Sequence, residues 1–226
     1  MSDEYKTTAV LFSGGLDSAV LVAERAREGP VVAIYVSVGF AWEAEERAMI
    51  ARLFAAPPLA GVVPPPVELT FDLRDVFAAD HWAVKGTPPA FDTPDEDVYL
   101  DGRNIVLLSK ASVFMARNRL SRVMLGPLAG NPFPDATPRF FETMARALSI
   151  GLAWEVAIET PLAALHKAEV IVRGAALGVP FELTLSCMQP VDGMHCGRCS
   201  KCRERRDGFR EAGVADPTRY RTRPKR

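Results

Sequence analysis

Short apolar runs alternate along this chain with segments in which apolar residues recur every three or four positions. The apolar runs predict buried β-strands at residues 8–12, 31–37, 67–71, 122–126 and 154–158. The longer period predicts helices at residues 19–26, 43–55, 104–120, 137–150 and 167–177. Strands that alternate with helices favour an α/β fold, here a doubly wound and mainly parallel sheet with helices on both faces.

Capping residues and prolines mark several element boundaries. Thr137 and Pro138 are suited to start a helix, and Gly178 is suited to end one. Two connections, at residues 74–101 and 127–136, are long and rich in proline or glycine, which is typical of functional loops. Ligands of parallel sheets bind beyond the carboxyl ends of the strands, so we expect the loops after Ser37, Phe71 and Gly126 to rim one cleft.

The residues between the first strand and the first helix form an anion-binding pattern, which reads Ser13-Gly14-Gly15-Leu16-Asp17-Ser18. Glycines permit a sharp turn and a close backbone approach, and a helix N-terminus offers free amides to phosphate. The spacing is neither the dinucleotide fingerprint nor the Walker loop. A carboxylate at Asp17 suits phosphate binding if Mg²⁺ lies between them. The alternative interpretation is a plain glycine-rich turn.

Composition and charge limit the class of protein. The 226 residues are 48% hydrophobic, enough for a full core. We expect a nucleotide-binding domain over residues 1–180 and a C-terminal segment over residues 181–226. No apolar run reaches the length of a membrane span, and the polar residues 1–6 do not resemble a secretion signal. A cytoplasmic protein is therefore expected, with no membrane partner.

Positive charge is concentrated at the C-terminus. Residues 203–226 carry nine basic and four acidic side chains, against 18 and 24 in the remainder. The simplest interpretation places Arg203, Arg205 and Arg206 on a solvated helix and leaves residues 218–226 as a frayed end. Nucleic acid is not an expected partner.

All four cysteines lie within one short segment, at Cys187, Cys196, Cys199 and Cys202. Two overlapping Cys-x-x-Cys units and a remote fourth thiolate can close a tetrahedral Zn²⁺ site, which we favour. A disulfide or an iron–sulfur cluster is the alternative. Four thiolates complete a zinc shell, so we expect the adjacent His195 to make local hydrogen bonds.

The nucleotide loop resembles the PP-loop of ATP pyrophosphatases, and further motifs narrow the resemblance to the 7-cyano-7-deazaguanine synthase family. These motifs are Gly102-Arg103-Asn104, Phe133-Pro134-Asp135, Thr160-Pro161-Leu162, Lys167-Ala168-Glu169, Thr184-Leu185-Ser186-Cys187 and residues 196–206. The resemblance spans nearly the whole chain. It implies a PP-loop fold with a small zinc-binding segment.

The resemblance also implies an activity, in which 7-carboxy-7-deazaguanine and ammonia are converted to the nitrile through two adenylated intermediates. The expected cofactors are ATP, Mg²⁺ and Zn²⁺, and the expected partners are a small carboxylate and ammonia, with a homodimer left open. The nucleotide-binding residues it implies are Leu11, Phe12, Ser13, Gly14, Gly15, Leu16, Asp17 and Ser18. The catalytic candidates are Asp17, Ser18, Lys167 and Arg103, although Lys167 and Arg103 also fit a solvated lysine and a structural ion pair.

Two loops depart from the family pattern. Residues 38–42 hold Phe40 and Trp42 where the family carries Gln and His, and residues 127–137 are shorter and less polar than usual. We therefore expect substrate choice to depend on these loops. A divergent ligase for a related carboxylate, a sulfur transferase acting on tRNA and a zinc-ribbon nucleic-acid-binding protein are the alternatives. Sulfur transfer is disfavoured because the zinc site would use every cysteine.

Overall fold

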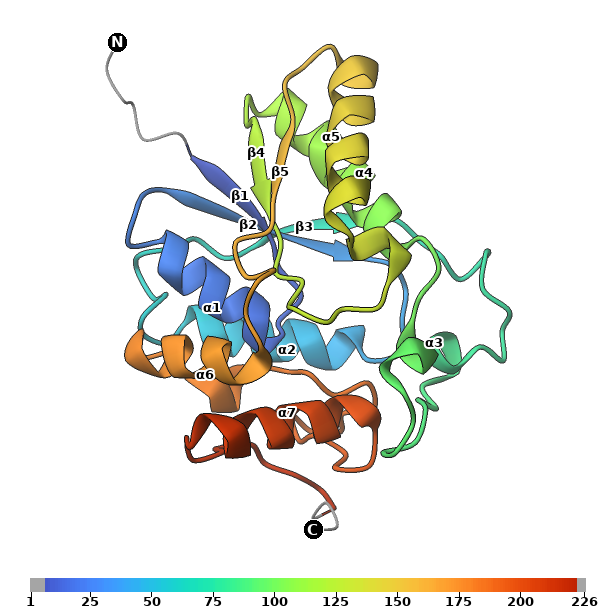
Figure 1. Cartoon of the computed structure of the whole chain (residues 1–226), viewed down its shortest axis with the longest axis vertical. Coiled ribbons are helices and arrows are strands. Elements are labelled where there is room, and N and C mark those ends of the chain that lie inside the picture. Colours follow the sequence, from blue (N-terminus) through green and yellow to red (C-terminus); the bar gives the residue numbers. More distant parts are fainter. Residues whose placement is uncertain (1–6, 223–226) are drawn as a thin grey trace.

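The computed structural model describes residues 7–222, and a five-stranded parallel sheet organises them (Figure 1). From one edge to the other, its strands are β3 (Val67–Thr70), β2 (Val31–Ser37), β1 (Thr8–Leu11), β4 (Arg122–Met124) and β5 (Ala157–Glu159). Every neighbouring pair runs parallel. The predicted sheet class is thereby confirmed.

Five helices follow strands as predicted: α1 (Leu16–Arg25), α2 (Glu43–Phe54), α4 (Arg103–Arg117), α5 (Pro138–Leu152) and α6 (Lys167–Ala176). The structure also holds the short α3 (Trp82–Lys85) and the C-terminal α7 (Ser200–Ala212). The cap of α5 is confirmed, since the Thr137 hydroxyl accepts the Phe140 amide at 3.2 Å. Within residues 7–222, no helix combines the length and apolar character needed to cross a bilayer.

The sheet has an apolar core on each face. Along β1, Ala9 and Leu11 lie in the core formed with α4 and α5, whereas Val10 lies in the core formed with α1, α2 and α6. Both sets of side chains are buried, which explains why this strand is a continuous apolar run. Helices on both faces were expected and are confirmed.

The predicted boundaries differ most from the structure in two places. The last strand, expected at residues 154–158, is β5 at Ala157–Glu159, because α5 continues to Leu152 and ends at Ala153 in the left-handed conformation. The Trp154 indole then donates to the Leu120 carbonyl at 2.8 Å, outside the sheet. The connection at 74–101 was expected to be irregular but holds α3 and a short 3-10 helix at Asp95–Val98.

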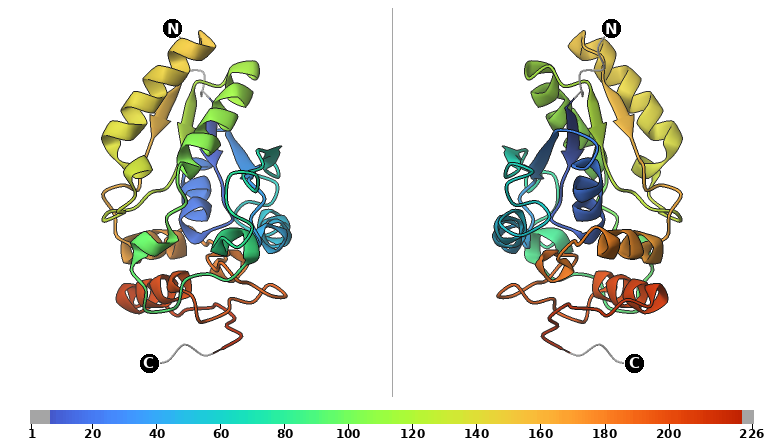
Figure 2. Two further views of the ribbon diagram at one scale, coloured as in Figure 1. Left: turned by 90° about the vertical axis from the view of Figure 1, so that its right-hand side faces the viewer. Right: turned by 90° about the vertical axis from the view of Figure 1, so that its left-hand side faces the viewer.

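The C-terminal segment forms a further layer. Helix α7 packs on α6 below the sheet and is the outermost helix there (Figure 2). The expectation that Arg205 is solvated is wrong, because its side chain is 1% exposed. Its guanidinium donates to the hydroxyls of Thr218 and Thr184 and to the Phe181 carbonyl, at 2.6–2.9 Å. A fully paired guanidinium can be buried, which the charge pattern alone did not indicate.

The end of the chain is also more ordered than expected. His195 donates its amide to the Arg219 carbonyl at 2.9 Å and accepts the Arg221 amide at 2.8 Å. Gly197 lies so close that a Cβ atom there would be 1.9 Å from the Thr222 carbonyl oxygen. Residues 218–222 are therefore fixed against the cysteine segment and are not frayed, and residues 223–226 lie outside the described part.

Two helical glycines offer a matched test of the packing between α6 and α1. A Cβ at Gly174 would lie 2.5 Å from both Val20 and Phe181, whereas a Cβ at Gly151 in α5 would meet no atom within 4 Å. We expect Gly174→Ala to lower the free energy of unfolding by about 1–3 kcal/mol, since overpacking outweighs the better helix propensity. Gly151→Ala should leave it unchanged or raise it by up to about 1 kcal/mol.

Urea denaturation of the two variants measures this difference. A Gly174→Ala variant as stable as Gly151→Ala would show that α6 does not approach α1 this closely.

Candidate active site

The predicted nucleotide loop connects β1 to α1 and has the geometry of an anion site. Gly14 has a φ of +75°, and a Cβ there would lie 3.1 Å from Ile50, so both the turn and its packing favour glycine. Gly15 caps α1 with no side-chain hydrogen bond to the first turn. The amides of that turn therefore stay available to a ligand. The Ser18 hydroxyl donates to the Gly15 carbonyl at 3.0 Å and lies 3.4 Å from the Ser13 hydroxyl.

Lys167, the first residue of α6, lies between two carboxylates. Its ammonium donates to Asp17 Oδ2 at 2.6 Å and lies 2.8 Å from Glu204 Oε1 on α7. Glu204 also accepts from Lys201 at 2.7 Å. Gly208 leaves room for this arrangement, since a Cβ there would lie 2.4 Å from the Lys167 stem. The open interpretation of Lys167 as a solvated lysine is wrong, because the side chain is only 17% exposed.

This network keeps Lys167 and Glu204 charged. Burial lowers the pKa of Lys167, but Asp17 and Glu204 outweigh burial and hold that pKa above its ordinary value. Burial likewise raises the pKa of Glu204, but Lys167 and Lys201 bring it well below its ordinary value. Lys167 is therefore a cation at the start of the nucleotide loop's helix, at any physiological pH.

One oxygen of Asp17 has no partner. Oδ2 binds Lys167, while Oδ1 is buried and makes no hydrogen bond within the described residues. An orphaned carboxylate oxygen beside a phosphate-binding loop fits a Mg²⁺ ligand, because hard cations take carboxylate oxygens and phosphate together. The residues present are thus compatible with the expected metal.

Two cavities meet at this loop. The first, of about 240 Å³, opens between the carboxyl ends of β1 and β4, where the strand order reverses and α/β proteins bind ligands. The second, of about 270 Å³, extends toward α2 and the C-terminal segment. Their shared wall consists of Ser13, Gly15, Asp17, Val98, Leu100, Arg103 and Phe133.

The predicted nucleotide residues divide between these cavities. The first is lined by Leu11, Phe12, Ser13, Gly15, Asp17 and Ser18, and the second by Leu16 and Lys167 among others. Gly14 packs against Ile50 and lines neither. The expected rim is correct for Gly126 and Trp42, whereas the connection after β3 contributes only from Trp82 onward.

Arg103 is held at the junction by two of the sequence motifs. The next residue, Asn104, donates its amide to Asp135 Oδ2 and its side-chain nitrogen to the Asp135 carbonyl, both at 2.9 Å. Burial raises the pKa of Asp135, and the Asn104 hydrogen bonds and the Arg103 charge oppose that rise. The Arg103 Nε atom is buried with no partner in the described residues. The guanidinium thus keeps an unused donor, and the alternative of a structural ion pair is not observed among the described residues.

The four cysteines converge into one cluster. Their sulfur atoms all lie within 4.8 Å of one another, with Cys202 Sγ at 3.5 Å from Cys199 Sγ and 3.9 Å from Cys196 Sγ. Tetrahedral Zn²⁺ with bonds of about 2.3 Å requires sulfur separations of about 3.8 Å, so the cluster fits the metal. None of the four is in a disulfide. His195 accepts the Ser186 amide at 3.2 Å through Nε2, as expected for a residue with a local role.

Sequence reasoning missed two acidic residues of the site. Glu204 lies within the motif at residues 196–206, but its ion pair with Lys167 was not predicted. Glu46 lines the second cavity and is 7% exposed. Glu46 precedes Met49, Ile50 and Leu53 by three, four and seven residues, so it lies on the apolar face of α2. An acidic residue on an apolar helix face was the sequence signal that could have identified it.

Comparison with known proteins agrees with this geometry. Residues 7–213 match the family described as "Queuosine biosynthesis protein QueC". Proteins named 7-cyano-7-deazaguanine synthase are 33% identical in Methanoculleus marisnigri, 34% in Geobacter sp. and 37% in Azoarcus sp.. Each alignment covers 95% of this chain and 96–99% of the relative. The chain therefore belongs to the queuosine biosynthesis protein QueC family.

Proposed function

We propose that this protein is an ATP-dependent carbon–nitrogen ligase that converts 7-carboxy-7-deazaguanine and ammonia to 7-cyano-7-deazaguanine. The observation that carries the proposal is the meeting of two cavities at the PP-loop, beside Asp17, Lys167 and Arg103. A reaction between ATP and a second substrate needs two such volumes with a common wall. Family membership and the names of the relatives support the choice of substrate.

The reaction balances as two successive activations. A carboxylate oxygen attacks the α-phosphorus of ATP and expels pyrophosphate, and ammonia then displaces AMP to give the amide. The amide oxygen attacks a second ATP in the same way, and loss of AMP and a proton leaves the nitrile. Negative charge develops on a leaving pyrophosphate or AMP in each step, so the protein acts chiefly by positioning and by charge neutralisation.

The residues divide the work as follows. We place ATP in the first cavity, with Leu11 and Phe12 against the nucleoside and the amides and hydroxyls from Ser13 to Ser18 around the phosphates. The acid occupies the second cavity. Lys167 and Arg103 then border the junction where the α-phosphorus meets the carboxylate, and both can balance its charge.

Two metals complete the proposal. Mg²⁺ would be held by Asp17 through its unpartnered Oδ1 and would neutralise phosphate charge. Zn²⁺ would be held by the four cysteines and would stabilise residues 181–226 as a structural segment. Because these thiolates are clustered, none is free to carry sulfur, which argues against the sulfur transferase.

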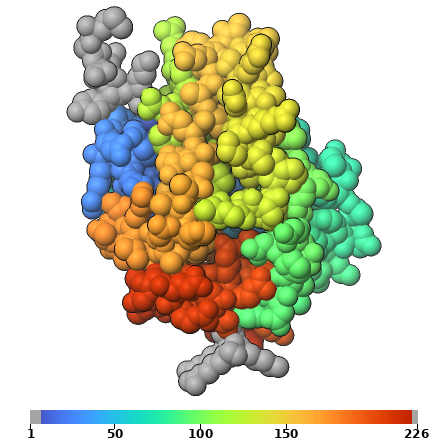
Figure 3. Space-filling model, viewed as in Figure 1, coloured from blue at the N-terminus to red at the C-terminus, as the bar shows by residue number. Residues whose placement is uncertain are grey.

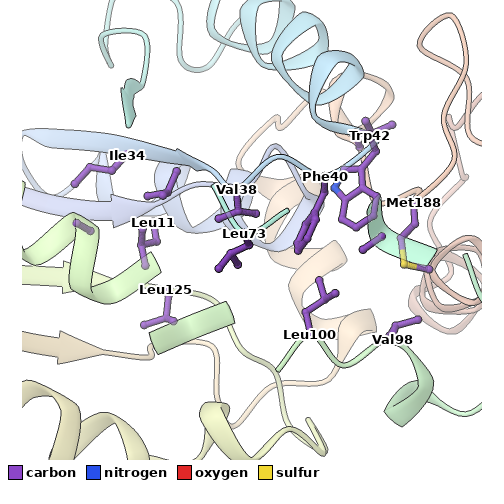
Figure 4. Packing of buried hydrophobic residues seen from close by; sticks show 14 of the residues in the cluster. Leu11, Ile34, Val38, Phe40, Trp42, Leu73, Val98, Leu100, Leu125 and Met188 are labelled. Atoms are coloured by element: carbon purple, nitrogen blue, oxygen red, sulfur yellow. The ribbon is translucent and has the colours of Figure 1, made fainter. Parts of the chain in front are cut away.

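The two loops that differ from the family pattern, at residues 38–42 and 127–137, line the cavities to different extents. Phe40 points into the apolar core beside Leu73 and Leu100 (Figure 4) and lines neither cavity. Trp42 lines the second cavity, Pro127 and Asn131 line the first, and Phe133 lines both. We therefore propose that the loop at 127–137 adapts the nucleotide side and that Trp42 adapts the acid side.

The direct test is a product assay. Purified protein, supplied with ATP, Mg²⁺, ammonia and 7-carboxy-7-deazaguanine, should form 7-cyano-7-deazaguanine with two AMP and two pyrophosphate released per nitrile. Mass spectrometry and phosphate analysis measure both. Neither nitrile nor amide after complete incubation would overturn the function.

The junction can be tested by removing one charge. Asp17→Asn should reduce kcat by about 10²-fold or more, because it weakens both the hold on Lys167 and the proposed metal ligand. Glu24→Gln is the matched control, since it breaks an ion pair of the same helix with Arg173, remote from the cavities. Near-normal pyrophosphate release by Asp17→Asn would remove the loop from the reaction.

Metal analysis tests the cysteine cluster. We expect about one Zn²⁺ per chain, and we expect Cys199→Ser to lower both the zinc content and the thermal midpoint, because metal binding is coupled to folding. Arg198→Ala, an exposed neighbour between two ligands, should change neither. Iron with sulfide, or no metal, would refute the zinc assignment.

A further inference from the structure

The wall that helix α2 contributes to the second cavity, beside the PP-loop, holds a buried carboxylate. Glu46, on α2, is 7% exposed, and no described basic residue forms an ion pair with it at 4 Å or less. The Tyr35 hydroxyl donates to Oε2 at 2.8 Å. A carboxylate can accept about four hydrogen bonds, and an ionised one is costly to bury without partners. Glu46 therefore has acceptor capacity that the protein itself does not use fully.

A second glutamate on the same helix shows the contrast. Glu43 is equally buried, but its carboxylate accepts from the Ser37 hydroxyl and from the amides of Val38 and Gly39, at 2.7–3.0 Å. It fixes the start of the loop after β2 and lines neither main cavity. Glu43 thus has a complete structural role, which leaves Glu46 as the carboxylate on α2 without one.

Burial and a nearby cation act in opposite directions on the pKa of Glu46. Burial raises the pKa of Glu46 to about 7, and Arg103, Tyr35 and Trp42 oppose that rise. Arg103 lines the same cavity and carries the unpartnered Nε described above. An acceptor and a cationic donor in the lining of one cavity suit a ligand that bears N–H groups on one edge and an anion on another.

Aromatic side chains make the walls flat and apolar. The rings of Trp42 and Trp82 stack on each other with centroids 5.7 Å apart, and both line the cavity. Phe133 lines it from the opposite loop, and Met188 adds an apolar contact beside Trp42 (Figure 4). Such walls favour a planar heterocycle.

We propose that Glu46 determines substrate specificity by accepting hydrogen bonds from the ring N–H and the exocyclic amino group of a 2-amino-4-oxopyrimidine edge. Arg103 receives the carboxylate of the same molecule. This inference rests on the proposed function and deepens it. The pairing places the substrate carboxylate at the wall shared with the first cavity, where Asp17 and Gly15 border the phosphate site.

The test compares the binding of two ligands to the wild type and to Glu46→Gln. Calorimetry measures binding of 7-carboxy-7-deazaguanine and of its analogue without the 2-amino group, each to the intact protein loaded with Zn²⁺. Wild type should prefer the amino compound by about 10- to 100-fold, the worth of one hydrogen bond to a charged group. Glu46→Gln should bind the amino compound about 10- to 100-fold more weakly and lose the preference, because an amide cannot accept both hydrogen bonds.

Matched controls separate recognition from folding. Glu45→Gln changes the neighbouring carboxylate, which accepts the amides of Asp192 and Gly193 and does not line the cavity. It should bind both ligands as wild type does, and ATP affinity should stay within about twofold in Glu45→Gln and Glu46→Gln, since neither residue lines the first cavity. Tyr35→Phe removes the one hydroxyl that orients Glu46 and should reduce the preference without abolishing it. That variant carries the test if Glu46→Gln does not fold.

The outcomes distinguish this inference from the function. Glu46→Gln that keeps the wild-type preference overturns the assignment of Glu46, even if the wild type makes the nitrile. Wild type that makes no nitrile but discriminates the 2-amino group through Glu46 overturns the proposed function and supports the inference.

Discussion

The placement of Lys167 between Asp17 and Glu204 is the interaction on which the rest of the site depends. These three residues come from α6, α1 and α7, so one ammonium joins the nucleotide loop to the C-terminal segment. A second link is parallel to it, since Leu185 donates its amide to the Gly14 carbonyl at 2.8 Å. Without a cation between them, these two half-buried carboxylates would repel each other, which would oppose the approach of α7 to the nucleotide loop.

The close approach of the helices follows from that constraint. Gly174 allows α6 to pack near α1, and Gly208 allows the aliphatic part of Lys167 to pack against α7. Figure 3 shows the result, with the C-terminal segment packed against the surface of α6. The cysteine cluster holds the start of α7, and Cys187 and Glu204 both line the second cavity. The proposed zinc site therefore supports α7 and also borders the second cavity through Cys187.

Local patterns made much of this predictable. The loop from Ser13 to Ser18 and the cysteine spacing each depend on residues close in sequence, and the apolar runs report burial directly. The convergence of Arg103, Lys167 and Glu204 depends on how distant elements pack, and no local pattern encodes it. Arg205 was wrongly placed in solvent because its partners are hydroxyls and a carbonyl, which do not stand out in a charge pattern. Glu46 was missed because it is one of three acidic residues near the start of α2, where acidic side chains commonly serve only to complement the helix dipole.

The order of the contacts along the chain has a consequence for biosynthesis on the ribosome. Asp17 emerges early, its cation Lys167 is made 150 residues later, and Glu204 and the residues that clasp His195 follow near the end. The α/β layers can form as they emerge, because every strand after β1 pairs with a strand that has already been made. The second cavity cannot form in this way, since part of its lining comes from the C-terminal segment, which is made last. A nascent chain of this protein therefore holds no partner for the Asp17 carboxylate until Lys167 has been made, and the second cavity is completed only when the C-terminal segment follows.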